Sequence, residues 1–227
     1  MAKFHFVEDY QNLVRSLMQQ HPLPEAMSLA VGGNWEGTGL ACANLLMSCG
    51  LKDGMTVLDF GCGSGRVASA LSKKLELSNF VGVDVVPELL QYAASICPKN
   101  YRFFVNHSLE LPIPDQVFDF AYAFSVFTHL LQTEIGIYSI GIMQKLKPNG
   151  IFVFSFLEMD RHWKTFQDSM LAHLQHGQPY PHLNIFLSRD QIVTIAQQLG
   201  FEVEKWVDPD DPIHGIGQSV VVLRKKI

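Results

Sequence analysis

Three glycines at alternate positions, Gly61, Gly63 and Gly65, follow a short apolar segment that ends near Asp59. Glycine inside a structural element lowers stability, so its usual justification is a backbone with positive φ or a ligand lying against the main chain. The next apolar segment also ends in an acid, Asp84, about 20 positions beyond the glycines. An acid at the tip of the second strand of a βαβ unit can accept hydrogen bonds from both hydroxyls of a ribose. These residues therefore predict a nucleoside site at the ends of two adjacent strands.

Strand-like and helix-like segments alternate through the middle of the chain, which predicts a mostly parallel sheet with helices on both faces. Apolar runs and turn residues predict strands at 55–60, 79–84, 101–106, 117–124 and 151–156, and helices at 64–75, 87–97 and 134–146. A helix from about 189 to 199 and two closing strands, 201–207 and 218–224, complete the pattern. Strands joined without a helix must pair antiparallel or lie apart.

The first 50 residues precede this alternation and are predicted to form a helical cap. Apolar spacing predicts a helix over 4–20, and a second helix is expected at 40–49. Between them, residues 31–39 hold four glycines around Trp35. This segment is expected to be a flexible entrance with an aromatic anchor, or a simple loop whose Trp35 fills the core.

Residues 158–187 break the alternation after the fifth strand and are predicted to be a lid-like insertion above the functional edge of the sheet. Its notable side chains are Trp163, Phe166, Tyr180, His162, His173, His176 and His182. The aromatic residues either close over a substrate or form a small core of the insertion. Two of the histidines are spaced i, i+3, but the i, i+4 pair with a glutamate that marks a zinc helix is absent, so no metal site is predicted.

The composition favours one globular domain, residues 1–227, because 48% of the residues are hydrophobic and 17% are charged. A net charge of −5 disfavours binding to nucleic acid through phosphates. No apolar run is long enough to cross a bilayer and the amino terminus lacks the apolar core of a signal peptide, so we expect a cytoplasmic protein without membrane contact. The four cysteines form no CxxC pair and are expected to be reduced hydrophobic residues.

Taken in order, these segments resemble the class I S-adenosylmethionine (SAM)-dependent methyltransferases, over most of the chain from about residue 30. The resemblance rests on VLDFGCGSGR (57–66), VGVDVVPELLQYA (81–93), ELPIPDQVFDFAYAFSVFTHL (110–130) and LKPNGIFVFS (146–155). The glycine motif alone is moderately specific, whereas four motifs in order at natural spacings are strongly specific. The resemblance implies a three-layer, Rossmann-like α/β fold with a seven-stranded sheet in the order 3-2-1-4-5-7-6, in which only strand 7 is antiparallel.

The same resemblance implies SAM as the cofactor and S-adenosylhomocysteine (SAH) as its product. The residues implied to bind the cofactor are Asp59, Gly61, Cys62, Gly63, Gly65, Asp84, Val85, Ser108, Leu109 and Phe124. Asp59 would orient the amino group of the cofactor, and Asp84 would accept the ribose hydroxyls. His107 stands where this family commonly has an acid that meets the adenine, so the backbone amides of Ser108 and Leu109 are expected to serve instead.

Methyl transfer is an in-line displacement in which proximity and orientation supply much of the rate. His129 follows the fourth strand and is either a base that removes a proton from the acceptor or a histidine that packs a helix. The expected acceptor is a small molecule, while the methylated atom and the oligomeric state stay open. Two alternatives are a SAM-binding sensor or partner subunit without turnover, and an NAD-dependent oxidoreductase, although the third glycine comes one residue early for the latter.

Overall fold

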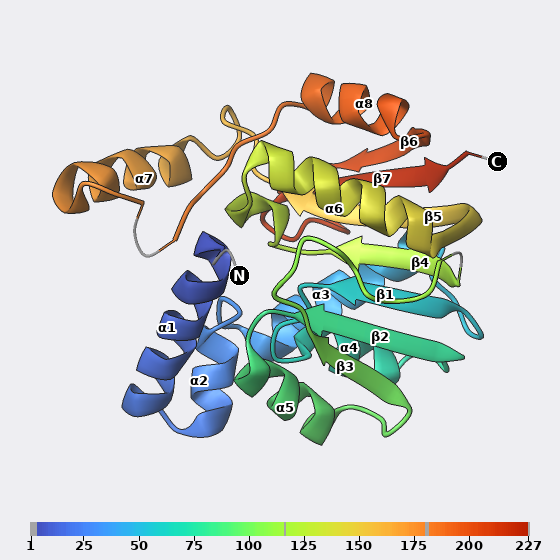
Figure 1. Cartoon of the computed structure of the whole chain (residues 1–227), viewed down its shortest axis with the longest axis horizontal. Coiled ribbons are helices and arrows are strands. Elements are labelled where there is room, and N and C mark those ends of the chain that lie inside the picture. The colour runs from blue at the N-terminus through green and yellow to red at the C-terminus, as the bar shows by residue number, and fades with distance from the viewer. Residues whose placement is uncertain (1–3, 116, 180–181, 227) are drawn as a thin grey trace.

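The computed structural model describes residues 4–115, 117–179 and 182–226. Their strands form a seven-stranded sheet in the order β3-β2-β1-β4-β5-β7-β6 (Figure 1). The strands are β1 (Thr56–Phe60), β2 (Asn79–Asp84), β3 (Tyr101–Val105), β4 (Phe118–Ala123), β5 (Leu146–Phe156), β6 (Phe201–Val207) and β7 (Ser219–Lys225). Neighbouring strands are parallel except that β7 is antiparallel to both β5 and β6. The predicted strand order and direction are confirmed.

Helices cover both faces of the sheet. They are α1 (His5–Gln20), α2 (Leu23–Leu29), α3 (Trp35–Ser48), α4 (Arg66–Ser72), α5 (Pro87–Ile96), α6 (Gln132–Lys145), α7 (Trp163–His176) and α8 (Arg189–Gln198), with a 3₁₀ turn, η1 (Phe127–His129), after β4. One face packs on α3 and α4 through Leu46 and Leu71, and the other packs on α6 and α8 through Ile142 and Ile192. The result is the predicted three-layer α/β arrangement, in which the carboxyl ends of β1, β2 and β4 meet at one edge.

The glycine-rich segment 31–39 is not a loop throughout, because only 31–34 form a turn and α3 already begins at Trp35. Asn34 adopts a left-handed conformation (φ 43°) just before the helix and turns the chain into it. Gly39 lies within α3, where an added Cβ would approach the carbonyl oxygen of Arg66 to 3.1 Å. Glycine here permits close packing of α3 on α4, and it does not mark a loop. Trp35 packs edge-on against Tyr92 of α5.

Two smaller differences from the predicted elements are found at other places. The helix α2 (Leu23–Leu29) was not predicted, although Pro24 occupies a first-turn position that a helix tolerates. The strand β5 begins at Leu146 and not at residue 151, since Leu146 already pairs with Phe118 of β4 across an irregularity.

The amino-terminal helices lie across the carboxyl edge of the sheet. Val14 of α1 and Met27 of α2 are fully buried in a small cluster with Val86 and Leu89, at the start of α5. This cluster attaches α1 and α2 to α5, and Figure 1 shows these helices on the β2 side of the sheet. None of the helices in the described part of the chain is long and apolar enough to span a membrane.

The segment between β5 and α8 contains α7, which projects away from the sheet (Figure 1) and has no buried residues. Trp163 and Phe166 pack on each other at 5.4 Å between ring centroids, and Phe166 packs on Phe186 at 5.3 Å. Tyr180 lies outside the described residues. The described aromatic side chains thus contact one another, and a lid role for this insertion stays a prediction. The helix α8 begins as predicted, with Ser188 accepting a hydrogen bond from the amide of Gln191.

Candidate functional site

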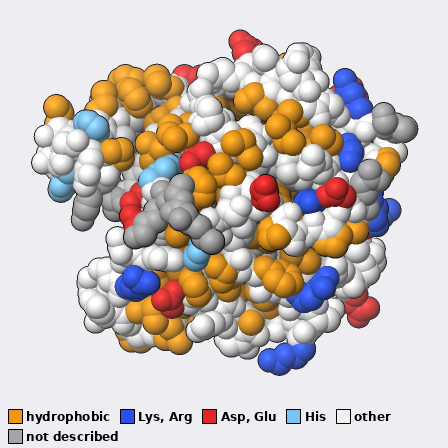
Figure 2. All heavy atoms as spheres, viewed as in Figure 1, with side chains coloured by type: hydrophobic (Ala, Val, Ile, Leu, Met, Phe, Trp, Pro, Cys, Tyr) orange, Lys and Arg blue, Asp and Glu red, His pale blue; other side chains and the backbone are white. Residues whose placement is uncertain are grey.

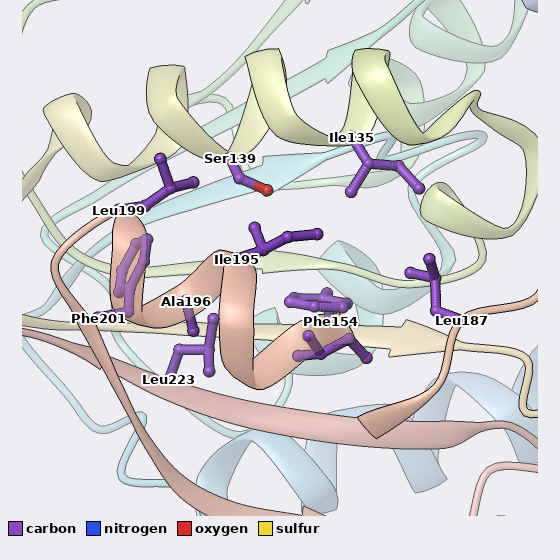
Figure 3. A pocket seen from close by; sticks show the side chains of 10 residues that line it. Ile135, Ser139, Phe154, Leu187, Ile195, Ala196, Leu199, Phe201 and Leu223 are labelled. Atoms are coloured by element: carbon purple, nitrogen blue, oxygen red, sulfur yellow. The ribbon is translucent and has the colours of Figure 1, made fainter. Parts of the chain in front are cut away.

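A cavity of about 400 Å³ lies at the edge where β1, β2 and β4 end. This volume is within the roughly 300–1,000 Å³ typical of small-molecule sites. Its wall combines the glycine turn after β1, the tips of β2 and β4, and residues of α1. A second hollow, between α6, α8 and β5 (Figure 3), measures only about 10 Å³ and has Ser139 as its one polar lining residue. That space holds at most about one water molecule, so the larger cavity is the candidate site.

The glycine turn has two different structural reasons for its glycines. Gly61, Gly63 and Gly65 all have positive φ, at 77°, 54° and 82°. A Cβ on Gly61 would lie 2.2 Å from a methyl carbon of Val126, and both Gly61 and Gly63 line the cavity. Gly65 does not line it; its missing Cβ allows contact with Ala93, which would be 2.7 Å away, and so lets α4 pack on α5.

Gly61→Ala is expected to lower the free energy of unfolding by clearly more than Gly54→Ala, a matched control. Both glycines have φ of 77°, but nothing lies within 4 Å of a Cβ on Gly54. The left-handed conformation alone costs a non-glycine residue about 1–2 kcal/mol, and Gly61→Ala adds the displacement of Val126. Urea unfolding of both variants measures the difference. Equal losses would mean that Val126 moves without cost.

Asp84 organises the glycine turn by its carboxylate. Its Oδ2 accepts a hydrogen bond from the amide of Gly63 (2.8 Å), and its Oδ1 accepts from the amides of Val85 (2.7 Å) and Val86 (3.0 Å). Burial raises the pKa of Asp84, and the three amide hydrogen bonds act in the opposite direction. A carboxylate has about four acceptor positions, so Oδ2 at the cavity wall keeps capacity for a ligand hydroxyl.

Asp59 is the most deeply buried acid of the cavity wall, with 2% of its surface exposed. The hydroxyl of Tyr122 donates a hydrogen bond to its Oδ2 at 2.7 Å. Burial raises the pKa of Asp59 to about 8; the hydrogen bond from Tyr122 lowers the pKa and the charge of Asp84 raises it further. The carboxyl group is therefore poised to ionise when a cation arrives. Tyr122 is itself buried in the core, at the cavity wall.

Arg66 is a wall residue that the sequence analysis did not assign to the site. Its Nη1 donates a hydrogen bond to the carbonyl oxygen of Gly33 (2.8 Å), while its Nε is buried without a partner among the described residues. Burial lowers the pKa of this guanidinium. The sequence could have indicated Arg66 as a site residue, because it is a cationic residue directly after the glycine turn.

The remaining predicted cofactor residues divide into two groups. Cys62, Val85 and Phe124 line the cavity, whereas Ser108 and Leu109 do not. The amide of Ser108 is already used, because it donates to Oδ1 of Asn106 at 3.1 Å.

Asn106 itself lies in the wall, and its Nδ2 donates to the carbonyl oxygens of Ser108 and Glu110. His107 lies outside the wall, with Nε2 2.8 Å from the carbonyl oxygen of Val85. The loop after β3 is thus held by Asn106, a role that the sequence analysis missed.

His129 lies in the wall beside two rings from distant parts of the chain. Its ring centroid is 5.5 Å from that of Tyr10 in α1 and 4.4 Å from that of His182. Its Nδ1 lies 2.8 Å from the carbonyl oxygen of Leu183, which can only accept, so Nδ1 carries the proton and Nε2 the lone pair. Burial lowers the pKa of His129 to about 4, which keeps the ring neutral at neutral pH.

A polar group from the far end of the chain completes the wall at the tip of β4. Ser125 has a left-handed backbone (φ 56°), and its amide donates to Oγ of Ser155 at 2.7 Å. Both hydroxyls contact Oε1 of Gln218, at 3.2 Å from Ser125 and 2.6 Å from Ser155. Strained backbone held in place by surrounding structure is a recurrent property of functional sites. Gln218, just before β7, is a wall residue that no local motif indicated.

The sheet order, the glycine turn and the acid at the tip of β2 define a nucleoside-binding α/β enzyme of the class I methyltransferase architecture. Residues 35–205, well over half of the chain, match the family model described as "Methyltransferase domain". The chain belongs to this family, for which the sequence analysis expects SAM as the cofactor.

The individual proteins that resemble this chain are only distantly similar to it in sequence. A ribosomal protein L11 methyltransferase of Burkholderia cenocepacia is 30% identical over 140 residues, which are 59% of this chain and 44% of that protein. The chain thus spans less than half the length of the curated relatives it matches. The magnesium protoporphyrin IX methyltransferase ChlM of Synechocystis, solved with bound SAH, has a TM-score of 0.69 at 14% identity, covering 97% of this chain and 98% of that one. The [4+2]-cyclase SpnF has a TM-score of 0.65 at 18% identity, covering 96% of each chain. These two likenesses show the shared fold.

Three observations indicate that the wall residues can bind SAM. SAM carries an ammonium, a carboxylate and a ribose. Among the described residues, the buried Asp59 has no cationic partner and the Nε of Arg66 has no acceptor, while Oδ2 of Asp84 has spare acceptor capacity. No group of three or more His, Cys, Asp or Glu residues suited to hold a metal ion is found in the described ranges.

Proposed function

We propose that this chain transfers the methyl group of SAM to a small molecule enclosed in the 400 Å³ cavity. The observation that carries the proposal is the distribution of charge in the wall. Its charged side chains are Asp59, Arg66 and Asp84 in the described part of the chain, and all three belong to the ends of β1 and β2 or the start of α4. The part of the wall beyond β4 is apolar, aromatic or neutral, and is available for an acceptor.

When bound, SAM supplies an electrophilic methyl group on a sulfonium and leaves as SAH. We assign Asp59 to its ammonium, Arg66 to its carboxylate and Asp84 to its ribose hydroxyls, because each of these side chains has an unused polar position at the wall. The other residues proposed to line its site are Gly61, Cys62, Gly63, Val85 and Phe124. Exclusion of water by the apolar wall supports transfer to the acceptor and not to water.

Segments of the chain partly cover the cavity, and this favours a small acceptor over a protein side chain. Phe6, Tyr10 and Leu13 of α1 form part of the wall, and His182 adds a further part of it. The described wall residues beyond β4 also include no carboxylate that could hold a lysine ammonium before it loses its proton. The face shown in Figure 2 presents Lys and Arg as separate spots without a basic patch, which does not favour a nucleic acid.

The decisive experiment compares acceptor sources with radiolabelled SAM. The full chain is incubated with a metabolite extract filtered to remove macromolecules, with a ribosomal protein fraction, and with neither. The proposal requires label in the filtered extract. Label in the protein fraction alone would assign a protein acceptor instead. Binding of SAH by calorimetry without label in any sample would favour a sensor or partner subunit without turnover.

A further inference from the structure

The acceptor side of the cavity is the part of its wall beyond β4. The side chains there indicate which class of acceptor binds. Resting on the proposed function, we infer that the acceptor is a flat, uncharged aromatic molecule methylated on a hydroxyl oxygen, and that His129 takes the hydroxyl proton while Gln218 orients a neighbouring polar group. The inference depends on three features of the wall beyond β4: its lack of charged side chains, its aromatic rings, and two of its polar groups, His129 and Gln218.

The lack of charge excludes acceptors that bind as ions. Every charged side chain in the described wall is already matched to a group of SAM. An acceptor with a carboxylate or phosphate would lose its hydration without gaining a cation, and an ammonium would lose it without gaining an anion. Such burial without a partner is strongly unfavourable.

The rings form a flat-sided part of the wall. The rings of Tyr10 and His182 are stacked, 5.7 Å apart with an angle of 18° between their planes, and His129 lies edge-on to both. Phe6 and Tyr138 extend the same apolar side of the cavity and pack edge-on at 6.4 Å. Aromatic rings recognise other flat rings by offset or edge-on contact.

Two polar groups have unused capacity at this wall. Nε2 of His129 holds a lone pair and has no hydrogen-bond partner among the described residues. Gln218 uses Oε1 for Ser125 and Ser155, which leaves its Nε2 as a donor. A hydroxyl donates to the histidine, and a neighbouring oxygen on the same ring accepts from the glutamine.

The low basicity of His129 favours an acceptor whose hydroxyl group is acidic. Burial keeps the pKa of its ring at about 4, so it is a weak base. The groups facing it are Tyr10, whose pKa is raised by burial, and His182, whose pKa is lowered by burial; the carboxylate of Asp9 acts on both of them. A proton passes to such a base far more readily from an aromatic hydroxyl than from an aliphatic one.

The transfer step balances without a further reactant. The acceptor oxygen forms a bond to the methyl carbon as the carbon–sulfur bond breaks, and that electron pair stays on sulfur. The hydroxyl proton moves to Nε2 of His129 and then to water. The products are an aryl methyl ether, neutral SAH and one proton.

The experiment uses four probes of similar size with the full chain: 2-naphthol, 2-naphthylamine, 2-naphthoate and the saturated alcohol 2-decalinol. Affinity is measured by calorimetry on the SAH complex, and turnover is measured with SAM. We expect 2-naphthol to bind at least about tenfold more tightly than 2-naphthoate and to be methylated fastest. His129→Gln should lower kcat for 2-naphthol by about 100-fold or more, the usual contribution of a positioned base, with KM and SAH affinity little changed. His173→Gln, an exposed histidine on α7 outside the cavity wall, is the matched control and should behave as the native chain.

Preference for the amine, the carboxylate or the saturated alcohol would overturn the inference, as would an unchanged kcat in His129→Gln. The labelled product of the metabolite extract separates this failure from failure of the proposed function. A labelled product that withstands alkaline hydrolysis, stays neutral in acid, contains no sulfur and releases labelled methyl iodide in hot hydriodic acid is an ether and supports the inference. A product that releases labelled methanol in alkali is an ester, and one that becomes a cation in acid is an amine; either result keeps small-molecule methyl transfer and rejects the hydroxyl acceptor.

Discussion

Asp84→Ala is expected to weaken SAH and SAM binding at least about tenfold and to lower the free energy of unfolding by about 3 kcal/mol. A hydrogen bond to a charged group contributes roughly 1.5–3 kcal/mol, and the variant loses the proposed contact with the ribose. It also loses three hydrogen bonds to the amides of Gly63, Val85 and Val86. The sequence alone predicts an effect on binding with an intact fold; the three amide contacts add an effect on stability. Calorimetry with SAH and urea unfolding measure the two quantities.

A matched control for this variant is Asp53→Ala, away from the cavity. The side chain of Asp53 also accepts from one backbone amide, that of Glu76 at 2.8 Å, but it does not line the cavity. Its loss should cost about 1 kcal/mol and leave SAH affinity unchanged. If Asp84→Ala bound SAH as tightly as the native chain, Asp84 would have no place in the cofactor site.

The affinity for SAH is expected to rise with pH up to about 8, by roughly tenfold for each pH unit below that value. Asp59 has a pKa raised to about 8 by burial, so it is protonated in the unliganded protein at neutral pH. An ammonium placed beside it favours the ionised form, and binding therefore releases a proton. Calorimetry at pH 7 in buffers of different ionisation enthalpy should detect close to one proton released. A proton count near zero would mean that the ammonium does not meet Asp59.

The raised pKa of Asp59 also predicts how the stability of the fold changes with pH. Because the folded state holds the proton more tightly than the unfolded state, the contribution of Asp59 to stability is greatest below the ordinary carboxyl pKa and is lost as pH rises toward 8. Asp59→Asn has no ionisable group and so should gain stability relative to the native chain between pH 5 and about pH 8, while losing SAH affinity. Tyr122→Phe, which removes the hydrogen bond to Asp59, should move the pH dependence upward. Parallel unfolding curves for the native chain and Asp59→Asn at all pH values would contradict this assignment.

The sequence was sufficient to predict the sheet and the part of the site that depends on local pattern. The strand tips, the glycine turn and the two acids follow from apolar runs broken by glycine and aspartate within a few residues, so Asp59 and Asp84 were predicted beside one cavity and are found there. Helical periodicity also predicted α1, but it does not say which surface that helix covers. Tyr10 and Phe6 were therefore missed as wall residues.

Other differences have equally specific causes. Ser108 was predicted to offer a free amide, but the side chain of Asn106 takes that amide, and such a contact depends on a loop conformation that no periodic pattern encodes. Gln218 and His182 come to the cavity from positions far along the chain, where only the completed sheet brings them near β4. Gly37 and Gly39 indicated a loop, although both lie in α3, where Gly39 allows close contact with α4 and Gly37 leaves room for the side chain of Asn34.

The position of α1 has a consequence for the rate of ligand exchange. Only Phe6 and Val14 of its described side chains are buried, so this helix is held by far fewer apolar contacts than the strands it covers. Local opening of a weakly packed helix requires much less free energy than global unfolding. Phe6, Tyr10 and Leu13 lie in the cavity wall, so a transient detachment of α1 would open the cavity to a nucleoside. The residence time of SAH on the protein would then be set by how often that helix lifts, and turnover would be limited by product departure when the chemical step is fast.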